Sequence, residues 1–129
     1  MMSLRKLYII GVLALAFSVL FFSWLPHPSF RELSFFPNWL VRWTDKYGNL
    51  RTAIPFIPLS VFLKVITRTS NGKILLICIT LSLLAELGQL LLPLRSFDIG
   101  DILYALFGAV IGLLLELLFD TFRKKSSDL

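Results

Sequence analysis

Apolar residues along the 129-residue chain gather in four stretches, with short polar segments between them. The first stretch runs from Leu7 to Leu25 without a charged residue. About 20 apolar residues are enough to cross the hydrocarbon core of a bilayer. The pattern therefore predicts an all-α integral membrane bundle of about four transmembrane helices, with spans near 7–25, 52–67, 74–92 and 101–119.

The basic pair Arg5 and Lys6 in front of the first stretch is also typical of a signal peptide. The apolar run is longer than the usual signal-peptide core of about 7–15 residues, and no small-x-small cleavage site follows it. We therefore interpret the first stretch as an uncleaved transmembrane helix.

The second span is the least regular. Pro55 and Pro58 lie in its first half and predict a kinked or irregular start, because each lacks a backbone donor. Lys64 interrupts its second half, where its long side chain can reach the membrane surface. The pair Asn71-Gly72 predicts a turn between the second and third spans.

Residues 26–51, between the first two spans, form a polar segment rich in aromatic residues. Its apolar side chains recur at roughly helical spacing, interrupted by Pro37, with charged residues among them. This pattern favours a segment that lies in the membrane interface, and a lid over a site is the alternative. The apolar positions are Phe30, Leu33, Phe36, Trp39, Leu40 and Trp43.

Composition agrees with a membrane protein, since 57% of the residues are hydrophobic and only 16% are charged. The net charge of +5 comes from basic residues at the span ends rather than from a basic face interleaved with aromatics, which argues against nucleic-acid binding. With four spans, the two termini and the middle hairpin share one side. That side carries Arg5, Lys6, Lys64, Arg68, Lys73, Arg123, Lys124 and Lys125, and the other carries Arg31, Arg42, Lys46, Arg51 and Arg95.

The excess of basic residues predicts a multi-pass protein of the cell membrane with both termini in the cytoplasm. The single cysteine, Cys78, permits no intrachain disulfide and lies in an apolar run, where a packing role is expected. The single histidine, His27, has no second histidine or cysteine to share a metal site. We expect no cofactor and no metal, although counting residues leaves a carboxylate-only site open.

Ionisable residues cluster around the end of the third span and the start of the fourth. For an ionisable group inside a membrane, function is the first hypothesis, and a polar network that pins two helices together is the alternative. Arg95 is the expected partner of Glu86. The cluster consists of Glu86, Gln89, Arg95, Asp98 and Asp101, and Asp45, Asn49 and Arg51 approach the same membrane level as further members.

Small residues form a stripe along the fourth span: Ala105, Gly108 and Gly112. The spacing of the two glycines lets another helix approach closely. We expect this stripe to pack against the third span, with a homodimer face as the alternative.

The stretch from Ala85 to Gly112 resembles the VanZ-like family of membrane proteins. The resemblance rests on Glu86-x-x-Gln89, then Pro93-x-Arg95-Ser96-Phe97-Asp98-Ile99-x-Asp101, then Gly108 and Gly112, with a looser match at Ile54-Pro55-Phe56-Ile57-Pro58-Leu59 preceded by Asn49. It implies one domain over residues 1–129. Two positions depart from the family pattern, because Ala105 and Thr52 stand where the family usually has asparagine.

The resemblance implies a protein of the cell envelope, since the founding VanZ protein confers resistance to teicoplanin-type glycopeptides. We expect the cluster to bind a lipid-linked or amphipathic ligand, such as a cell-wall precursor or a glycopeptide, at the outer membrane face. One alternative is an enzyme that acts on a lipid headgroup through paired carboxylates, although no activated nucleophile is visible near the cluster. The other alternative is an oligomeric channel or transporter subunit.

Overall fold

The computed structural model describes residues 2–25, 29, 31 and 33–128. The part described is helical, with no strand. Its helices are α1 (Leu4–Ser23), α2 (Asn38–Lys46), α3 (Gly48–Ala53), α4 (Phe56–Thr67), α5 (Asn71–Gln89) and α6 (Ile99–Ser127). Four segments are long and apolar enough to cross a membrane: α1, the α3–α4 stretch from Gly48 to Thr67, α5 and α6. This confirms the all-α bundle of four spans.

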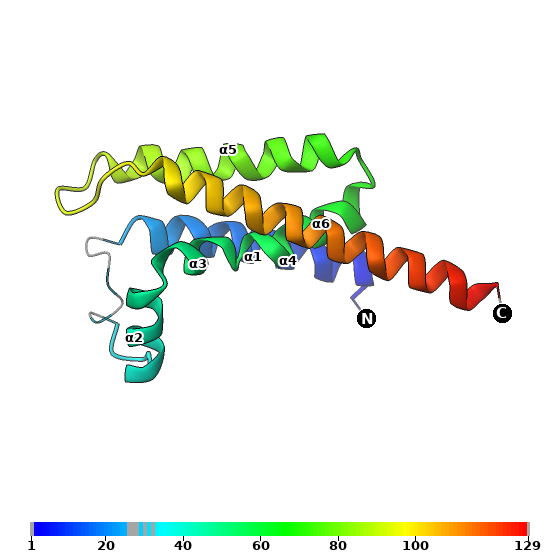
Figure 1. Ribbon diagram of the computed structural model, residues 1–129, viewed down its shortest axis with the longest axis horizontal. Coiled ribbons are helices and arrows are strands. Elements are labelled where there is room, and N and C mark those ends of the chain that lie inside the picture. The colour runs from blue at the N-terminus through cyan, green and yellow to red at the C-terminus, as the bar shows by residue number, and fades with distance from the viewer. Residues whose placement is uncertain (1, 26–28, 30, 32, 129) are drawn as a thin grey trace.

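The four spans run alongside one another, and both termini lie at the same end of the bundle (Figure 1). The α4–α5 turn lies at that end too, whereas the α5–α6 loop lies at the opposite end (Figure 1). The helix α2 lies across this opposite end rather than along the bundle (Figure 1). The chain therefore has a terminal end and a loop end.

The helices extend beyond the predicted spans at the terminal end. Ser3 caps α1 by accepting from the Lys6 backbone N–H at 3.3 Å, so that α1 includes Arg5 and Lys6. At the other end of the chain, α6 continues through Lys124 and Lys125. Charged residues can join a helix once it leaves the hydrocarbon core, because the side chains then reach water. Hydropathy alone therefore understates the length of these helices.

The second span is interrupted, as its prolines predicted. The last backbone bond of the first half runs from Ile54 N–H to the Leu50 oxygen at 3.1 Å, and Pro55 is the N-cap residue directly before α4. Pro58 lies in the first turn of α4, where a missing N–H breaks no intrahelical bond. The two prolines therefore divide the span into α3 and α4 without disrupting either helix.

The turn between α4 and α5 does not use Asn71-Gly72, which contradicts the prediction. Arg68 ends α4 in the left-handed conformation, with φ of 52°, and Lys64 Nζ donates to the Thr69 oxygen at 2.6 Å. Ser70 then caps α5 by accepting from the Lys73 N–H. Because this serine cap starts the helix at Asn71, the Asn-Gly pair becomes the first turn of α5.

The small-residue stripe of α6 packs against the second span rather than the third, which corrects the expected partner. A Cβ atom placed on Gly108 would overlap the backbone carbonyl of Ala53 in α3. A Cβ on Gly112 would overlap Ser60 Oγ and the Ile57 carbonyl in α4. Since α3 and α4 cover these glycines, they do not form an exposed homodimer face.

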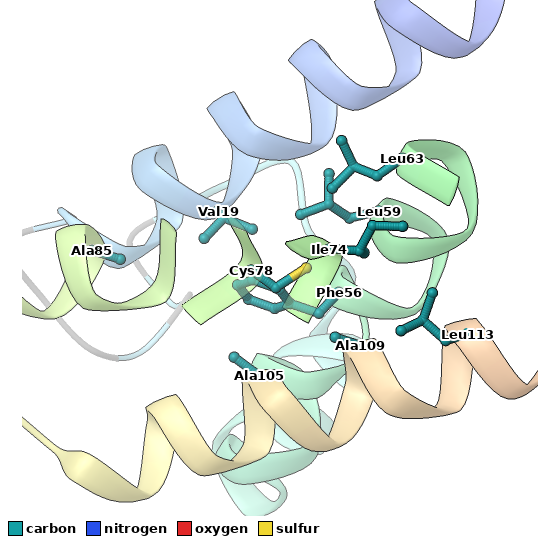
Figure 2. Close-up of a cluster of buried hydrophobic side chains, with 10 residues drawn as sticks. All are labelled: Val19, Phe56, Leu59, Leu63, Ile74, Cys78, Ala85, Ala105, Ala109 and Leu113. Carbon is teal, nitrogen blue, oxygen red and sulfur yellow. The ribbon is translucent and has the colours of Figure 1, made fainter. Parts of the chain in front are cut away.

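Side chains from the four spans meet in one apolar cluster (Figure 2). Phe56, Leu59, Ile74 and Cys78 are completely buried there. Ala105 lies in this cluster, also fully buried (Figure 2). Many large apolar side chains elsewhere point outward, including Phe17 at 68% exposure and Leu91 at 87%. An outward apolar surface is what contact with lipid requires, because lipid tails are as apolar as leucine.

The segment between α1 and α3 contains the amphipathic helix α2. Val41 and Thr44 are buried, whereas Trp39 on the other face is 67% exposed. An amphipathic helix lying across the end of a bundle has the geometry of a helix on a membrane surface. The predicted positions His27 and Phe30 lie outside the described residues.

Candidate functional site

A pocket of about 500 Å³ opens at the loop end of the bundle. Helices α1, α3, α4 and α5, the α5–α6 loop and the first turn of α6 contribute its walls. All five members of the predicted cluster line it, together with two of the three further candidates: Glu86, Gln89, Arg95, Asp98, Asp101, Asn49 and Arg51. Apolar side chains also line it, among them Val19 and Phe22 of α1 and Phe56 of α4.

Glu86 is the most buried acid of the pocket, at 3% exposure. Its Oε2 accepts a hydrogen bond from the Asp98 backbone N–H at 2.8 Å, and Gln89 Nε2 donates to its Oε1 at 3.5 Å. No nitrogen of Arg95 lies within 4.0 Å of Glu86, so the expected ion pair is wrong. The backbone of the α5–α6 loop satisfies this buried carboxylate instead, because the loop folds back over the end of α5.

Asp98 joins the loop to α6. Its backbone N–H binds Glu86, and its Oδ1 accepts from the Gly100 N–H at 2.7 Å, which caps the N-terminus of α6. An aspartate at this position satisfies an otherwise unpaired amide of the first turn and interacts favourably with the helix dipole. Asp98 therefore has a structural role at the edge of the pocket.

Asp101 connects the second, third and fourth spans. Its Oδ1 accepts from the Thr52 hydroxyl at 3.3 Å, and its carboxyl group faces that of Glu86 within hydrogen-bonding reach. Two carboxylates at such close range repel one another unless a proton or a cation lies between them. The charge of Arg51, on the neighbouring α3, acts on Asp101 and offsets part of this repulsion.

Arg95 lies in the α5–α6 loop with its side chain half-buried in the pocket. Within the described residues its guanidinium makes no hydrogen bond and no ion pair shorter than 4.0 Å. Burial lowers the pKa of Arg95 below its ordinary value, and the charge of Arg51 lowers it further, whereas Asp101 and Glu86 act in the opposite direction. An arginine nevertheless stays protonated at physiological pH. The pocket therefore holds a fixed positive charge.

A family model described as VanZ/LLP1 matches residues 6–120 of the chain. The chain belongs to the VanZ/LLP1 family. No curated protein and no solved structure matches it. The pocket-lining residues all lie within the range that the VanZ/LLP1 model covers.

The two positions that were expected to depart from the VanZ-like pattern, Thr52 and Ala105, lie in different surroundings. Thr52 keeps a polar contact, because its hydroxyl donates to Asp101. Ala105 lies in the apolar cluster and does not line the pocket. Alanine at position 105 therefore suits its apolar surroundings.

Asp45 is the predicted site member that the structure leaves outside the pocket. It lies on α2, where Ser29 Oγ donates to its Oδ2 at 2.9 Å and Arg31 Nε lies 3.7 Å from the same oxygen. The orientation of α2 across the bundle end, which the sequence does not specify, directs it elsewhere.

Sequence reasoning also missed a hydrogen bond that joins the end of α1 to α5 next to the pocket-lining residue Ala85. Trp24 follows α1, and its indole Nε1 donates to the Ala85 carbonyl of α5 at 3.0 Å. Gly88, one turn further along α5, has no side chain and makes room for the indole, since a Cβ there would overlap Trp24 Nε1.

The pocket residues suit binding better than nucleophilic attack. Ser82 and Ser96 line the pocket, but neither hydroxyl hydrogen-bonds another side chain in the part of the chain that the structure describes. Over the same part, no three His, Cys, Asp or Glu side chains are grouped so as to hold a metal ion. A pocket that combines charged donors and acceptors with apolar side chains can hold a ligand that is polar at one end and apolar at the other.

Proposed function

We propose that this VanZ/LLP1 protein binds the polar end of a lipid-linked or amphipathic ligand in the pocket at the loop end of the bundle. The observation that carries the proposal is the composition of that pocket. Its lining combines polar groups of α5, the α5–α6 loop and α6 with the apolar side chains of Val19, Phe22 and Phe56. Such a site satisfies a polar headgroup and keeps the adjoining chain out of water.

The loop end, in this proposal, faces the outside of the cell membrane and the termini face the cytoplasm. The distribution of lysine and arginine supports this orientation, because most of the basic residues lie at the terminal end. A reporter that is active only outside the cytoplasm, fused after Lys125, should be inactive. An active fusion would reverse the orientation and place the pocket at the inner face.

The outer position and the family membership together support a role in tolerance to glycopeptide antibiotics of the teicoplanin type. Cells that express the chain should then survive a higher concentration of such an antibiotic than cells that express Ser23→Trp, whose indole would fill the pocket, in the same amount in the membrane. Equal susceptibility of the two strains would remove the link to glycopeptides and leave ligand binding to be judged separately.

Binding itself is tested with purified protein and dodecyl amphiphiles whose headgroups are phosphate, phosphocholine or maltose. We expect saturable binding of one molecule by native mass spectrometry for at least one of them. Ser23→Trp should prevent it, because Ser23 lines the pocket at the end of α1. Phe21→Trp is the matched control, since Phe21 is exposed to lipid and outside the pocket.

The proposal fails if no amphiphile binds saturably, or if Ser23→Trp binds as well as Phe21→Trp while both remain folded. Chemical conversion of a bound amphiphile during the same measurement would instead support an enzyme acting on a lipid headgroup.

A further inference from the structure

The acids of the pocket are largely occupied within the protein. Glu86 accepts the Asp98 N–H, Asp98 caps α6 through Gly100, and Asp101 accepts the Thr52 hydroxyl. These bonds hold the loop, α6 and α3 together at the loop end. A ligand that replaced them would have to disassemble the walls of its own pocket.

Two arginines from different parts of the chain also line this pocket. Arg51 comes from α3 and Arg95 from the α5–α6 loop, yet both line the same cavity, close enough for their charges to act on each other. Two adjacent positive charges in a half-buried site repel, and burial strengthens the repulsion. The fold therefore places two guanidinium groups in one cavity beside its acids, with the donors of Arg95 directed to no protein acceptor in the described part.

We propose that Arg95, assisted by Arg51, binds a phosphate or diphosphate group at the polar end of the amphipathic ligand. A guanidinium presents its N–H donors in a planar fork that matches two phosphate oxygens. A phosphate has further oxygens and a second negative charge with which to meet a second arginine. The apolar lining residues Val19 and Phe22 would then contact the ligand's chain. This inference rests on the proposed function, because it assigns the headgroup chemistry of the same pocket.

The headgroup is tested by measuring the affinity of the purified chain for dodecyl phosphate, dodecyl phosphocholine and dodecyl maltoside, with inorganic phosphate and pyrophosphate as chainless probes. We expect dodecyl phosphate to bind most tightly. Arg95→Gln should weaken dodecyl phosphate about 10- to 100-fold, which is the range expected for hydrogen bonds to a charged group. The affinity of Arg95→Lys for dodecyl phosphate should lie between those of the unaltered chain and Arg95→Gln, since lysine keeps the charge but lacks the planar pair of N–H donors.

Arg42→Gln is the matched control, because Arg42 is an exposed arginine on α2 outside this pocket and its replacement removes the same charge. We expect it to bind dodecyl phosphate as the unaltered chain does. Thermal unfolding of each variant in detergent would show that it is folded before its affinity is compared.

The outcomes separate this inference from the proposed function. Equal binding of all three dodecyl headgroups, with no effect of Arg95→Gln, overturns the phosphate assignment and leaves amphiphile binding intact. Inorganic phosphate or pyrophosphate binding as tightly as dodecyl phosphate, with the same dependence on Arg95, supports the phosphate site and overturns the amphipathic ligand. Absence of binding by every probe overturns both.

Discussion

Replacing Glu86 by alanine should show how far the loop end depends on one buried carboxylate. Glu86 is almost fully buried and accepts the Asp98 N–H at 2.8 Å. The alanine variant leaves that backbone donor without its acceptor and opens a small cavity at the end of α5. Because Asp98 also caps α6, the start of the longest helix loses its tether to the bundle.

The cost follows from these contacts. A hydrogen bond to a charged group contributes about 1.5–3 kcal/mol. The bond from Gln89 at 3.5 Å is at the limit of hydrogen-bond geometry and adds little. With a small term for the cavity, we expect Glu86→Ala to lower the free energy of unfolding by about 2–4 kcal/mol. Glu86→Gln keeps an acceptor for the Asp98 N–H and can donate to Asp101. It should therefore lower the free energy of unfolding by no more than about 1 kcal/mol.

The assay is reversible unfolding by dodecyl sulfate in mixed micelles, followed by circular dichroism. Glu116→Ala is the matched control, because Glu116 is a half-buried acid of α6 with no hydrogen bond or ion pair in the described part. Its free energy of unfolding should lie within about 0.5 kcal/mol of that of the unaltered chain. A Glu86→Ala variant with the same free energy of unfolding as Glu116→Ala would show that the Glu86 carboxylate does not hold the α5–α6 loop.

Two further predictions use the same assay. Gly108→Ala should destabilise the chain by about 1–3 kcal/mol, because the new Cβ overlaps the rigid backbone carbonyl of Ala53. Gly72→Ala is the control and should be neutral or slightly stabilising, because a Cβ there meets nothing within 4 Å. Equal stability of the two variants would refute the close approach of α6 to α3. Trp24→Phe should cost about 1 kcal/mol through the lost indole bond to the Ala85 carbonyl, and an unchanged stability would show that this bond does not hold α1 to α5.

The sequence alone determined the number of spans and the residues of the polar cluster. Bilayer thickness sets a nearly fixed length for each apolar stretch, so hydropathy identifies the spans without knowledge of their neighbours. An ionisable residue in such a stretch is unusual enough to be noticed on its own. Glu86, Arg95 and Asp101 were therefore visible from the sequence, as was the break at Pro55.

The tertiary structure decided which of these residues meet. Glu86 binds the Asp98 backbone rather than Arg95, Gly108 packs against α3 rather than α5, and Asp45 lies outside the pocket. Helical periodicity gives the face on which a residue lies but not the helix that this face contacts, because lipid and protein are both apolar neighbours. Only the packed bundle brings Arg51 and Arg95 to one cavity, since charge attraction and helix packing act between segments that are distant in the sequence.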